Sequence, residues 1–600
     1  MNIRLADYVF NRLFELTGSR HCFFLSGGGI MHLCDALGRC TSIVPVAMHH
    51  EQAAAIAADA YGRVNNTVGI VLVTTGPGST NAITGVSGAY LESTPLLVIS
   101  GQVSRATFKG ASLVRQLGFQ EIDIVPIVKS FTKYAETVID PSTIKYHLEK
   151  AIYLAKEGRP GPVWLDIPVD VQGALVNPDE LQGFDPAVEG FEAQAKAPTP
   201  AELEQVLQLL NQAKRPLVIG GHGIWLSGAK ESFRKLLTQL QIPVQTTWNG
   251  IDLLEEDFPL FFGRANSYGP RYPNIILQNC DLILAIGARL GIQHIGYNYA
   301  AFAPQAKLIM VDVDQEELTK KTLNVSLPIH ADARMFIGLL SSVFKSTGNH
   351  ERWIAWCQKI KQAYPTITEY NEDPCFVDAY KFADELSDAM QPGDLIVPGS
   401  SGTGFTVTTQ MFRIKAGQRY ITSKGHAAMG YGLPSSIGAC IAGQLKRTVT
   451  IVGDGGLQLN IQELQTIIHN KLPVVLFIFN NKGYFSIRVT QHNYFSGKLV
   501  GSDTDSGTSM PDLQRIAEAY GFRYLRISNN AELREGINSA LHEPWPVLVE
   551  VLINPDKSLF PKLSSRRLED GQMASSTLDD MEPFLPREEL AQIRREALEI

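Results

Sequence analysis

The sequence predicts an α/β protein with three consecutive domains, each built on a doubly wound parallel sheet. Short apolar runs of strand length recur along the chain, and several of them enter a glycine-rich turn directly. Segments with helical spacing of apolar residues lie between these strands. The 600 residues exceed what a single hydrophobic core supports, so several domains are expected.

The domain boundaries follow changes in composition. The first domain covers residues 1–178, and an acidic stretch with Pro, Gly and Ala from Asn177 to Pro200 links it to the second, residues 198–345. A polar join from Ser346 to Asn371 leads to the third domain, residues 375–560. Residues 561–600 form a charged tail that ends in a helical run. The strands that support this division are Phe23 to Leu25, Val44 to Ala47, Ile70 to Val73, Pro216 to Ile219, Leu282 to Ile286 and Lys307 to Val313.

The third domain contains the most informative pattern, Gly453-Asp454-Gly455 followed after 24 residues by Asn480-Asn481. An apolar strand, Val449 to Val452, precedes it, and a second, Val474 to Phe479, ends at the Asn pair. Leu457, Ile461, Leu464 and Ile468 recur between them at helical spacing. Because parallel strands end at one edge of a sheet, the Asp and Asn oxygens meet there, and these are ligands that Mg²⁺ prefers. Backbone N–H groups of the turn suit a diphosphate.

This spacing resembles the diphosphate-binding motif of thiamine diphosphate enzymes. The resemblance implies that Mg²⁺ is held by Asp454, Asn481 and the backbone carbonyl of Gly483, with the cofactor against Gly453, Gly455 and Gly456. The alternative for the motif alone is an ordinary glycine-rich turn of an α/β protein.

A second segment, His49-His50-Glu51-Gln52-Ala53-Ala54-Ala55, begins an Ala-rich helical run that ends near Tyr61-Gly62-Arg63. It resembles the segment of the same enzymes that carries the cofactor-activating glutamate, here Glu51. A carboxyl group bonded to the pyrimidine ring of the cofactor acts as a general acid/base from a partly desolvated site. The alternative is a Glu that only complements the dipole of a helix.

Two further segments resemble parts of the same site. The segment from Ser423 to Pro434 resembles the stretch that supplies a large apolar residue under the bent cofactor, which implies that role for Met429. A buried core Met is the alternative. Gly402, Thr403 and Gly404 lie in a predicted phosphate-facing loop. Phe405 and Thr406 depart from the Gly-Gln-His pattern of some relatives.

The resemblance covers nearly the whole chain and extends to the acetohydroxyacid (acetolactate) synthase group. Supporting segments are Gly76 to Asn81, Ser100 to Val103 and Phe119 to Glu121, and Gln120 is a lesser catalytic candidate near the substrate. The resemblance implies a homodimer or larger homo-oligomer with active sites between subunits. It also raises the question of FAD, because a set of residues in the second domain falls where flavin-bearing relatives hold it; some relatives bind ADP there and others nothing. That set is Gly220, Gly221, Arg289, Asp312 and Asp332.

Departures from the synthase pattern bear on the second substrate. Biosynthetic synthases carry a Trp shortly after the Asn pair, and the run from Gly483 to Gln491 has none. This change, with a different tail at Leu563 to Arg567, resembles carboligases that attach a two-carbon unit to nucleotide-linked keto-sugars. His426 and Arg488 are candidate polar contacts for substrate, or structural groups.

Composition excludes several classes of function. The formal net charge is −8 and the pI about 5.9, so no basic surface for nucleic acid is expected. No apolar run approaches the ~20 residues of a membrane span. The N-terminus lacks the layout of a signal peptide, and seven cysteines without metal spacing indicate reduced thiols in a cytoplasmic protein.

The sequence therefore predicts a thiamine diphosphate- and Mg²⁺-dependent decarboxylating carboligase. It would transfer an acetyl unit from pyruvate to a second carbonyl compound, either a 2-keto acid or a nucleotide-linked keto-sugar. One alternative is a 2-keto acid decarboxylase of the same superfamily. Another is a non-catalytic nucleotide-binding protein, against which an intact Glu51 argues, because cofactor binding alone does not require that carboxyl group.

Overall fold

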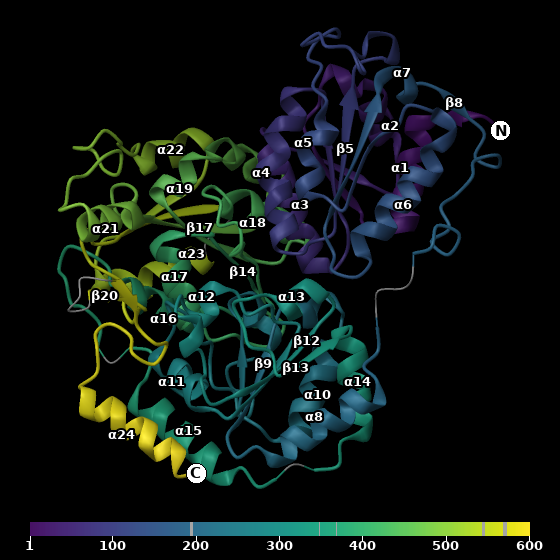
Figure 1. The fold of residues 1–600 in the computed structure, drawn as a ribbon. Helices are drawn as coiled ribbons and strands as arrows, with labels where there is room; N and C mark the ends of the chain where they lie inside the picture. Colours follow the sequence, from purple (N-terminus) through teal and green to yellow (C-terminus); the bar gives the residue numbers. More distant parts are fainter. Residues whose placement is uncertain (192–195, 347, 368, 543–545, 568–572) are drawn as a thin grey trace.

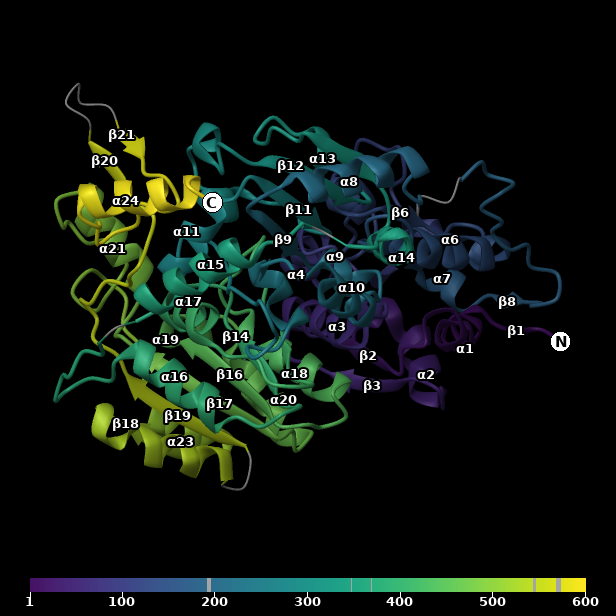
Figure 2. The ribbon, with the colours of Figure 1, turned by 90° about the horizontal axis from the view of Figure 1, so that it is seen from below.

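A computed structural model describes residues 1–191, 196–346, 348–367, 369–542, 546–567 and 573–600. Three parallel sheets, each flanked by helices, follow one another along the chain, which confirms the predicted fold class. Figure 1 shows the N-terminal domain beside the C-terminal one, with the central domain below both. The view in Figure 2 shows the last helix lying against the central domain. Part of the predicted first linker, residues 192–195, and part of the tail, residues 568–572, lie outside the described residues.

The N-terminal sheet has six strands in the order β3-β2-β4-β5-β7-β6. Its two central strands are buried along their whole length because their runs are apolar on both faces, as in a sheet covered by helices on two sides. The strands are β2 (His21–Phe24), β3 (Val44–Ala47), β4 (Gly69–Val73), β5 (Leu96–Gln102), β6 (Tyr134–Thr137) and β7 (Pro162–Pro168). The main helices are α1 (Leu5–Thr17), α2 (Met31–Arg39), α3 (Glu51–Asn65), α4 (Pro77–Leu91), α5 (Ile124–Val128) and α6 (Ile144–Lys156).

The C-terminal sheet repeats this topology in the order β15-β14-β16-β17-β19-β18. Its strands are β14 (Leu395–Pro398), β15 (Arg419–Tyr420), β16 (Thr448–Gly453), β17 (Val474–Asn480), β18 (Arg523–Ile527) and β19 (Val547–Leu552). Its helices include α16 (Ala379–Ala389), α17 (Gly402–Met411), α18 (Gly432–Ala442), α21 (Phe485–Tyr494), α22 (Leu513–Tyr520) and α23 (Leu533–His542). Where we expected one helix between the two motif strands, the chain forms three short ones, α19 (Asp454–Gln458), η7 (Ile461–Glu463) and α20 (Leu464–His469).

The equivalent helices of the two outer domains, α3 and α18, pack against each other. Small side chains allow this: a Cβ added to Gly438 would lie 1.9 Å from the carbonyl oxygen of Ala57. Further along, the hydroxyl of Tyr431 donates to Asp59 at 2.9 Å, and Arg63 Nη1 lies 3.3 Å from the same hydroxyl. Since Ala57 meets Gly438 and Arg63 meets Tyr431, the two helices run antiparallel.

The central sheet has five strands in the order β10-β9-β11-β12-β13. They are β9 (Pro216–Gly220), β10 (Val244–Thr246), β11 (Leu282–Ile286), β12 (Lys307–Asp312) and β13 (Leu327–His330), with helices α8 (Pro200–Gln212), α10 (Lys230–Leu240), α11 (Arg271–Asn279) and α14 (Ala333–Val343) around them. The expected polar join contains helix α15 (Glu351–Ala363). The side chain of Trp353 is fully buried there and donates to the carbonyl of Pro216 at 3.0 Å, so α15 belongs to the core of the central domain.

The tail returns to the central domain as well. Its predicted helical run is α24 (Arg587–Leu598), preceded by the short strands β20 (Ser565–Arg567) and β21 (Met573–Ser575). Ile593 and Ala597 are buried in the same hydrophobic cluster as Trp353. Among the helices that the structure describes, none combines the length and the apolar character needed to cross a membrane.

Candidate active site

Asp454 lies at the carboxyl edge of the C-terminal sheet, where β16 ends and α19 begins. The strand order places this point beside the switch between β14 and β16, which is where ligands bind in open α/β sheets. The Asp454 side chain is buried and accepts hydrogen bonds from the backbone N–H of Gly455 at 2.7 Å and of Gly483 at 3.0 Å. Burial raises the pKa of this carboxyl group to about 6, against the opposing effect of the two backbone donors.

Asn481 follows the end of the neighbouring strand β17 and completes the predicted pair of oxygen ligands. Its side chain is buried, and its Oδ1 atom has no hydrogen-bond partner among the described residues. The loop after it is held by Arg488, whose guanidinium donates to the carbonyls of Asn481 at 2.7 Å and Ser502 at 3.2 Å. Gly483 has φ +134°, and a Cβ there would lie 2.3 Å from the Ser502 carbonyl oxygen, so this turn requires glycine. Arg488 therefore holds the loop in place, so its contacts favour a structural role over a contact with substrate.

The predicted phosphate-facing segment Gly402, Thr403 and Gly404 is the first turn of helix α17 rather than a loop. The N-terminus of a helix offers free N–H groups and a positive dipole end to an anion. Thr403 is buried, and its Oγ1 has no hydrogen-bond partner among the described residues. A Cβ added to Gly402, Gly453 or Gly456 would meet no atom within 4 Å, so open space lies beside all three glycines.

Met429 lies on the turn before α18 and is 44% exposed. This excludes the alternative of a buried core methionine in the chain as described. The turn is held by Ser400, whose hydroxyl donates to the carbonyl of Ala428, and by Asn460, which donates to the carbonyl of Gly430 at 2.9 Å. Because Ser400 lies two residues before the start of α17, these contacts fix Met429 beside the predicted diphosphate site.

Glu51 is the first residue of α3, and its side chain is buried. His50 caps the helix by accepting a hydrogen bond from the N–H of Gln52 at 3.1 Å. The Oε2 atom of Glu51 accepts from the side chain of Asn81 on α4 at 3.0 Å, while Oε1 lies 3.2 Å from where a Cβ on Gly78 would be. The absence of a side chain at Gly78 therefore makes room for the carboxylate.

Gln120 lies at the rim of the same half of the site. It is exposed and adopts φ +62°. A Cβ added to Gly76 would lie only 2.1 Å from the backbone carbonyl oxygen of Gln120, so the two segments pack closely. Gly76 directly precedes helix α4, which supports Glu51 through Asn81. The structure thus brings Gln120 to the neighbourhood of Glu51.

Within one chain, the part of the site around Glu51 and the part around Met429 lie apart. Arg63, at the far end of α3 from Glu51, contacts Tyr431, which lies two residues after Met429. The twelve residues from Glu51 to Arg63 correspond to about 18 Å of helix. Met429 and Glu51 of the same chain therefore lie at opposite ends of the α3–α18 pair.

The central domain carries a cleft of about 700 Å³ at the carboxyl ends of β9, β11 and β12. Of the residues predicted to hold a flavin, Arg289, Asp312 and Asp332 line this cleft. Gly220 and Gly221 do not line it. Gly221 allows a close approach to the residue after β11, since a Cβ there would lie 2.1 Å from the carbonyl oxygen of Gly287. Burial raises the pKa of Asp312 to about 6.

Four further residues line this cleft although the sequence assigns none of them an individual role, namely Arg159, His222, Trp248 and Lys424. Arg159 reaches it from the N-terminal domain and pairs with Asp314 at 2.9 Å. Lys424 comes from the C-terminal domain, and its ammonium lies 4.2 Å from the ring centre of Trp248; burial lowers the pKa of Lys424 to about 7. Burial also lowers the pKa of His222, to about 3. Lys424 and His222 lie in segments that the sequence singles out, but their place in this cleft depends on the packing of three domains, which local spacing does not encode.

Comparison with known proteins agrees with this architecture. Residues 3–127, 203–340 and 401–551 match the N-terminal TPP binding domain, the central domain and the C-terminal TPP binding domain of thiamine pyrophosphate enzymes. The acetolactate synthase large subunit of Lactococcus lactis is 31% identical, covering 96% of this chain and 97% of the relative. The probable acetolactate synthase large subunit of Methanocaldococcus jannaschii is 30% identical, with 91% of both chains covered. The chain therefore belongs to the thiamine pyrophosphate enzymes of the acetolactate synthase type.

Proposed function

We propose that this protein is a thiamine diphosphate-dependent decarboxylating carboligase that transfers an acetyl unit from pyruvate to a second carbonyl compound. The relatives are named acetolactate synthases, and they align over nearly the entire chain. The observation that carries the proposal is the pairing of a buried carboxylate, Asp454, with the unpartnered buried amide oxygen of Asn481, beside open space at the N-terminus of α17.

The donor set at this edge fits Mg²⁺ and a diphosphate. Asp454 and Asn481 supply hard oxygen ligands, and the Gly483 carbonyl is the third that we propose. The first turn of α17, with Thr403, would bind the diphosphate oxygens through N–H groups and the free hydroxyl. When bound, thiamine diphosphate supplies a carbon nucleophile for the keto acid and accepts the electrons left by loss of CO₂.

Glu51 holds the proton that the chemistry requires. Its carboxyl group is buried, and the hydrogen bond from Asn81 to one of its oxygens fixes the orientation of the group. A carboxyl group in such a place can exchange a proton with a ring nitrogen of the cofactor. Met429 projects from its turn at the diphosphate side and would support the cofactor from below.

We further propose that each active site forms between two copies of the chain. The separation of Glu51 from Met429 along α3 supports this, since the two must approach one cofactor. Large apolar side chains are also exposed on both halves, as expected for surfaces covered by a partner. They are Leu113, Leu117 and Phe119 near Gln120, and Met429, Leu459 and Ile487 near Asp454.

Product analysis tests the proposed reaction. With thiamine diphosphate, Mg²⁺ and pyruvate, we expect CO₂ release and acetolactate; with added acceptors, mass spectrometry should show products larger by an acetyl unit. The absence of Trp after Asn481 predicts a roomy acceptor pocket, since one methylene is worth only ~1–3 kcal/mol in such a pocket. Acetaldehyde as the sole product would favour the decarboxylase, and cofactor binding without CO₂ release would favour the non-catalytic protein. A strict preference for 2-ketobutyrate over pyruvate and keto-sugars would contradict the acceptor prediction.

For the central cleft we propose FAD. A volume of about 700 Å³ is within the range of ligand sites, and a strand-end carboxylate such as Asp312 suits ribose hydroxyls. The Lys424 ammonium lines the cleft and has no hydrogen bond or ion pair among the described residues. It could therefore donate to an electron-rich edge of the flavin ring.

We expect the purified protein, or protein reconstituted with FAD, to show the absorbance of oxidised flavin and to release it on denaturation. Lys424→Met should weaken FAD binding about tenfold, because a hydrogen bond to a charged group is lost. Lys156→Met, on the N-terminal side of the cleft, gives a comparison within the same cleft. Equilibrium dialysis measures both affinities, and retention of ADP but not FAD would contradict the flavin proposal.

A further inference from the structure

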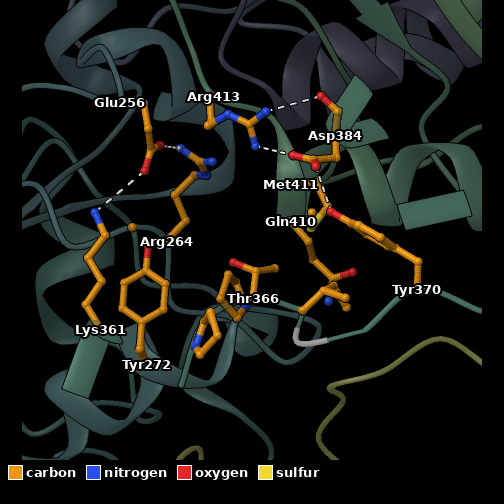
Figure 3. A pocket seen from close by; sticks show the side chains of 14 residues that line it. Glu256, Arg264, Tyr272, Lys361, Thr366, Tyr370, Asp384, Gln410, Met411 and Arg413 are labelled. Carbon is orange, nitrogen blue, oxygen red and sulfur yellow. Dashed lines mark hydrogen bonds and ion pairs between the residues drawn. The ribbon is translucent and has the colours of Figure 1, made fainter. Parts of the chain in front are cut away.

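A second cavity, of about 270 Å³, lies between the central and C-terminal domains. We call it the interdomain cavity. It shares no lining residue with the cleft of the central domain for which we propose FAD. One wall comes from the central domain and α15, with Glu256, Arg264 and Lys361 (Figure 3). The other comes from the C-terminal domain and the chain before it, with Tyr370, Asp384, Gln410 and Arg413 (Figure 3).

The two walls differ in charge balance. On one side, Arg413 pairs with Asp384 in the cavity and with the exposed Asp388 outside it, and the Tyr370 hydroxyl donates to Asp384 at 2.6 Å, so no cation is left without a carboxylate there. On the other side, Arg264 and Lys361 share the single carboxylate of Glu256 (Figure 3).

The two ion pairs on the second wall are long, and Lys361 also donates to the carbonyl of Phe261 at 3.3 Å. Lys361 Nζ lies 3.7 Å from Glu256 Oε1, and Arg264 Nη1 lies 4.0 Å from Oε2. Arg264 is 4% exposed, and its Nη1 atom has no hydrogen-bond partner among the described residues. A buried guanidinium nitrogen without an acceptor is costly, and an anion in the cavity would satisfy it.

An unpartnered acceptor lies on the same cavity. Gln410 is 2% exposed, and its Oε1 atom has no hydrogen-bond partner among the described residues. A buried amide oxygen accepts a hydrogen bond from a hydroxyl or an ammonium group. We propose that the interdomain cavity is a second binding site, which takes a small organic carboxylate bearing a hydroxyl or ammonium group. Its volume suits such a molecule and is too small for the dinucleotide of the other cleft.

Helix α17 connects this site to the predicted diphosphate site. Gln410 and Met411 at its C-terminal end line the cavity, and Arg264 Nη2 donates to the carbonyl of Phe412, the next residue, at 2.6 Å. Gly402 and Thr403 begin the same helix, and its ten residues span about 15 Å. An anion that draws Arg264 toward itself acts on one end of a rigid helix, so its binding should change the affinity for thiamine diphosphate, and the reverse.

Calorimetry on the full chain, loaded with thiamine diphosphate and Mg²⁺, tests the site with L-lactate, L-valine and acetate as probes. We expect saturable binding of lactate or valine, and weaker binding of acetate, which has no group to donate to Gln410. Lys361→Met should weaken it about tenfold, since a hydrogen bond to a charged group is lost. Glu256→Gln should strengthen it by removing the competing carboxylate.

Lys359→Met is the matched control, because Lys359 on the same helix is 62% exposed and pairs with Glu596 outside the cavity. Binding there should equal that of the wild type. No saturable binding of any probe would overturn the proposal, and so would equal binding in Lys361→Met, which would place the carboxylate in the active site instead. The coupling is tested by the affinity for thiamine diphosphate, which a saturating carboxylate should change in wild type but not in Lys361→Met; no change in wild type would overturn it.

Discussion

Glu51→Gln is expected to lower turnover by about 10²–10⁴-fold, the usual contribution of a general acid/base. The amide has the shape of the carboxyl group and its oxygen can still accept from Asn81, so the start of α3 should remain intact. It cannot release and regain a proton at neutral pH. Steady-state kinetics gives the loss, while calorimetry should show that thiamine diphosphate still binds.

Glu15→Gln makes the same chemical change on the surface of the same domain, where the side chain is 61% exposed and pairs with Arg12. It should leave turnover unaltered, since exposed ion pairs contribute little. Wild-type turnover in Glu51→Gln would show that this carboxyl group has no part in the chemistry.

Asp454→Ala is expected to abolish Mg²⁺-dependent retention of thiamine diphosphate. Asp454 is the one carboxylate in the proposed ligand set, and it also accepts from the N–H groups of Gly455 and Gly483. Breaking a buried charge pair costs about 3–5 kcal/mol, so the affinity should fall by at least about 100-fold. Titration calorimetry with and without Mg²⁺ measures this.

Asp503→Asn is the control, because Asp503 lies in a nearby loop where it accepts from the N–H of Ser506 and is not part of the ligand set. Asp454→Asn keeps the side-chain volume and separates loss of the charge from a local collapse of the turn. Unchanged thiamine diphosphate affinity in both Asp454 variants would refute the proposed metal site.

The two variants together test whether sites form between subunits. If Glu51 of one copy meets Asp454 of another, a dimer of one Glu51→Gln chain and one Asp454→Ala chain keeps one intact site of two. Purified through two different tags, it should show about half of the wild-type activity. If each chain used its own pair, every site would carry one change and the mixed dimer would be inactive.

The sequence by itself determined the parts of this protein that local patterns encode. Buried parallel strands such as β16 and β17 are continuous apolar runs, and the turns at their ends show as Gly453 and the Asn480-Asn481 pair. Helix α3 begins at Glu51 as its Ala-rich run predicted. The fold class and the family follow from these elements, because both depend on the order of strands, turns and helices along the chain.

Tertiary packing alone decided the rest. In α15 the apolar residues Trp353, Trp356, Cys357 and Ile360 recur at helical spacing, so the sequence carries the signal for the helix. That this face packs against the central sheet is decided by tertiary structure. The antiparallel pairing of α3 and α18 separates Glu51 from Met429, and it depends on contacts such as Gly438 with Ala57 between residues far apart in the chain. Lys424 and the interdomain cavity likewise arise where domains meet. Side chains from separate domains share no local spacing, and only the folded chain places them at one site.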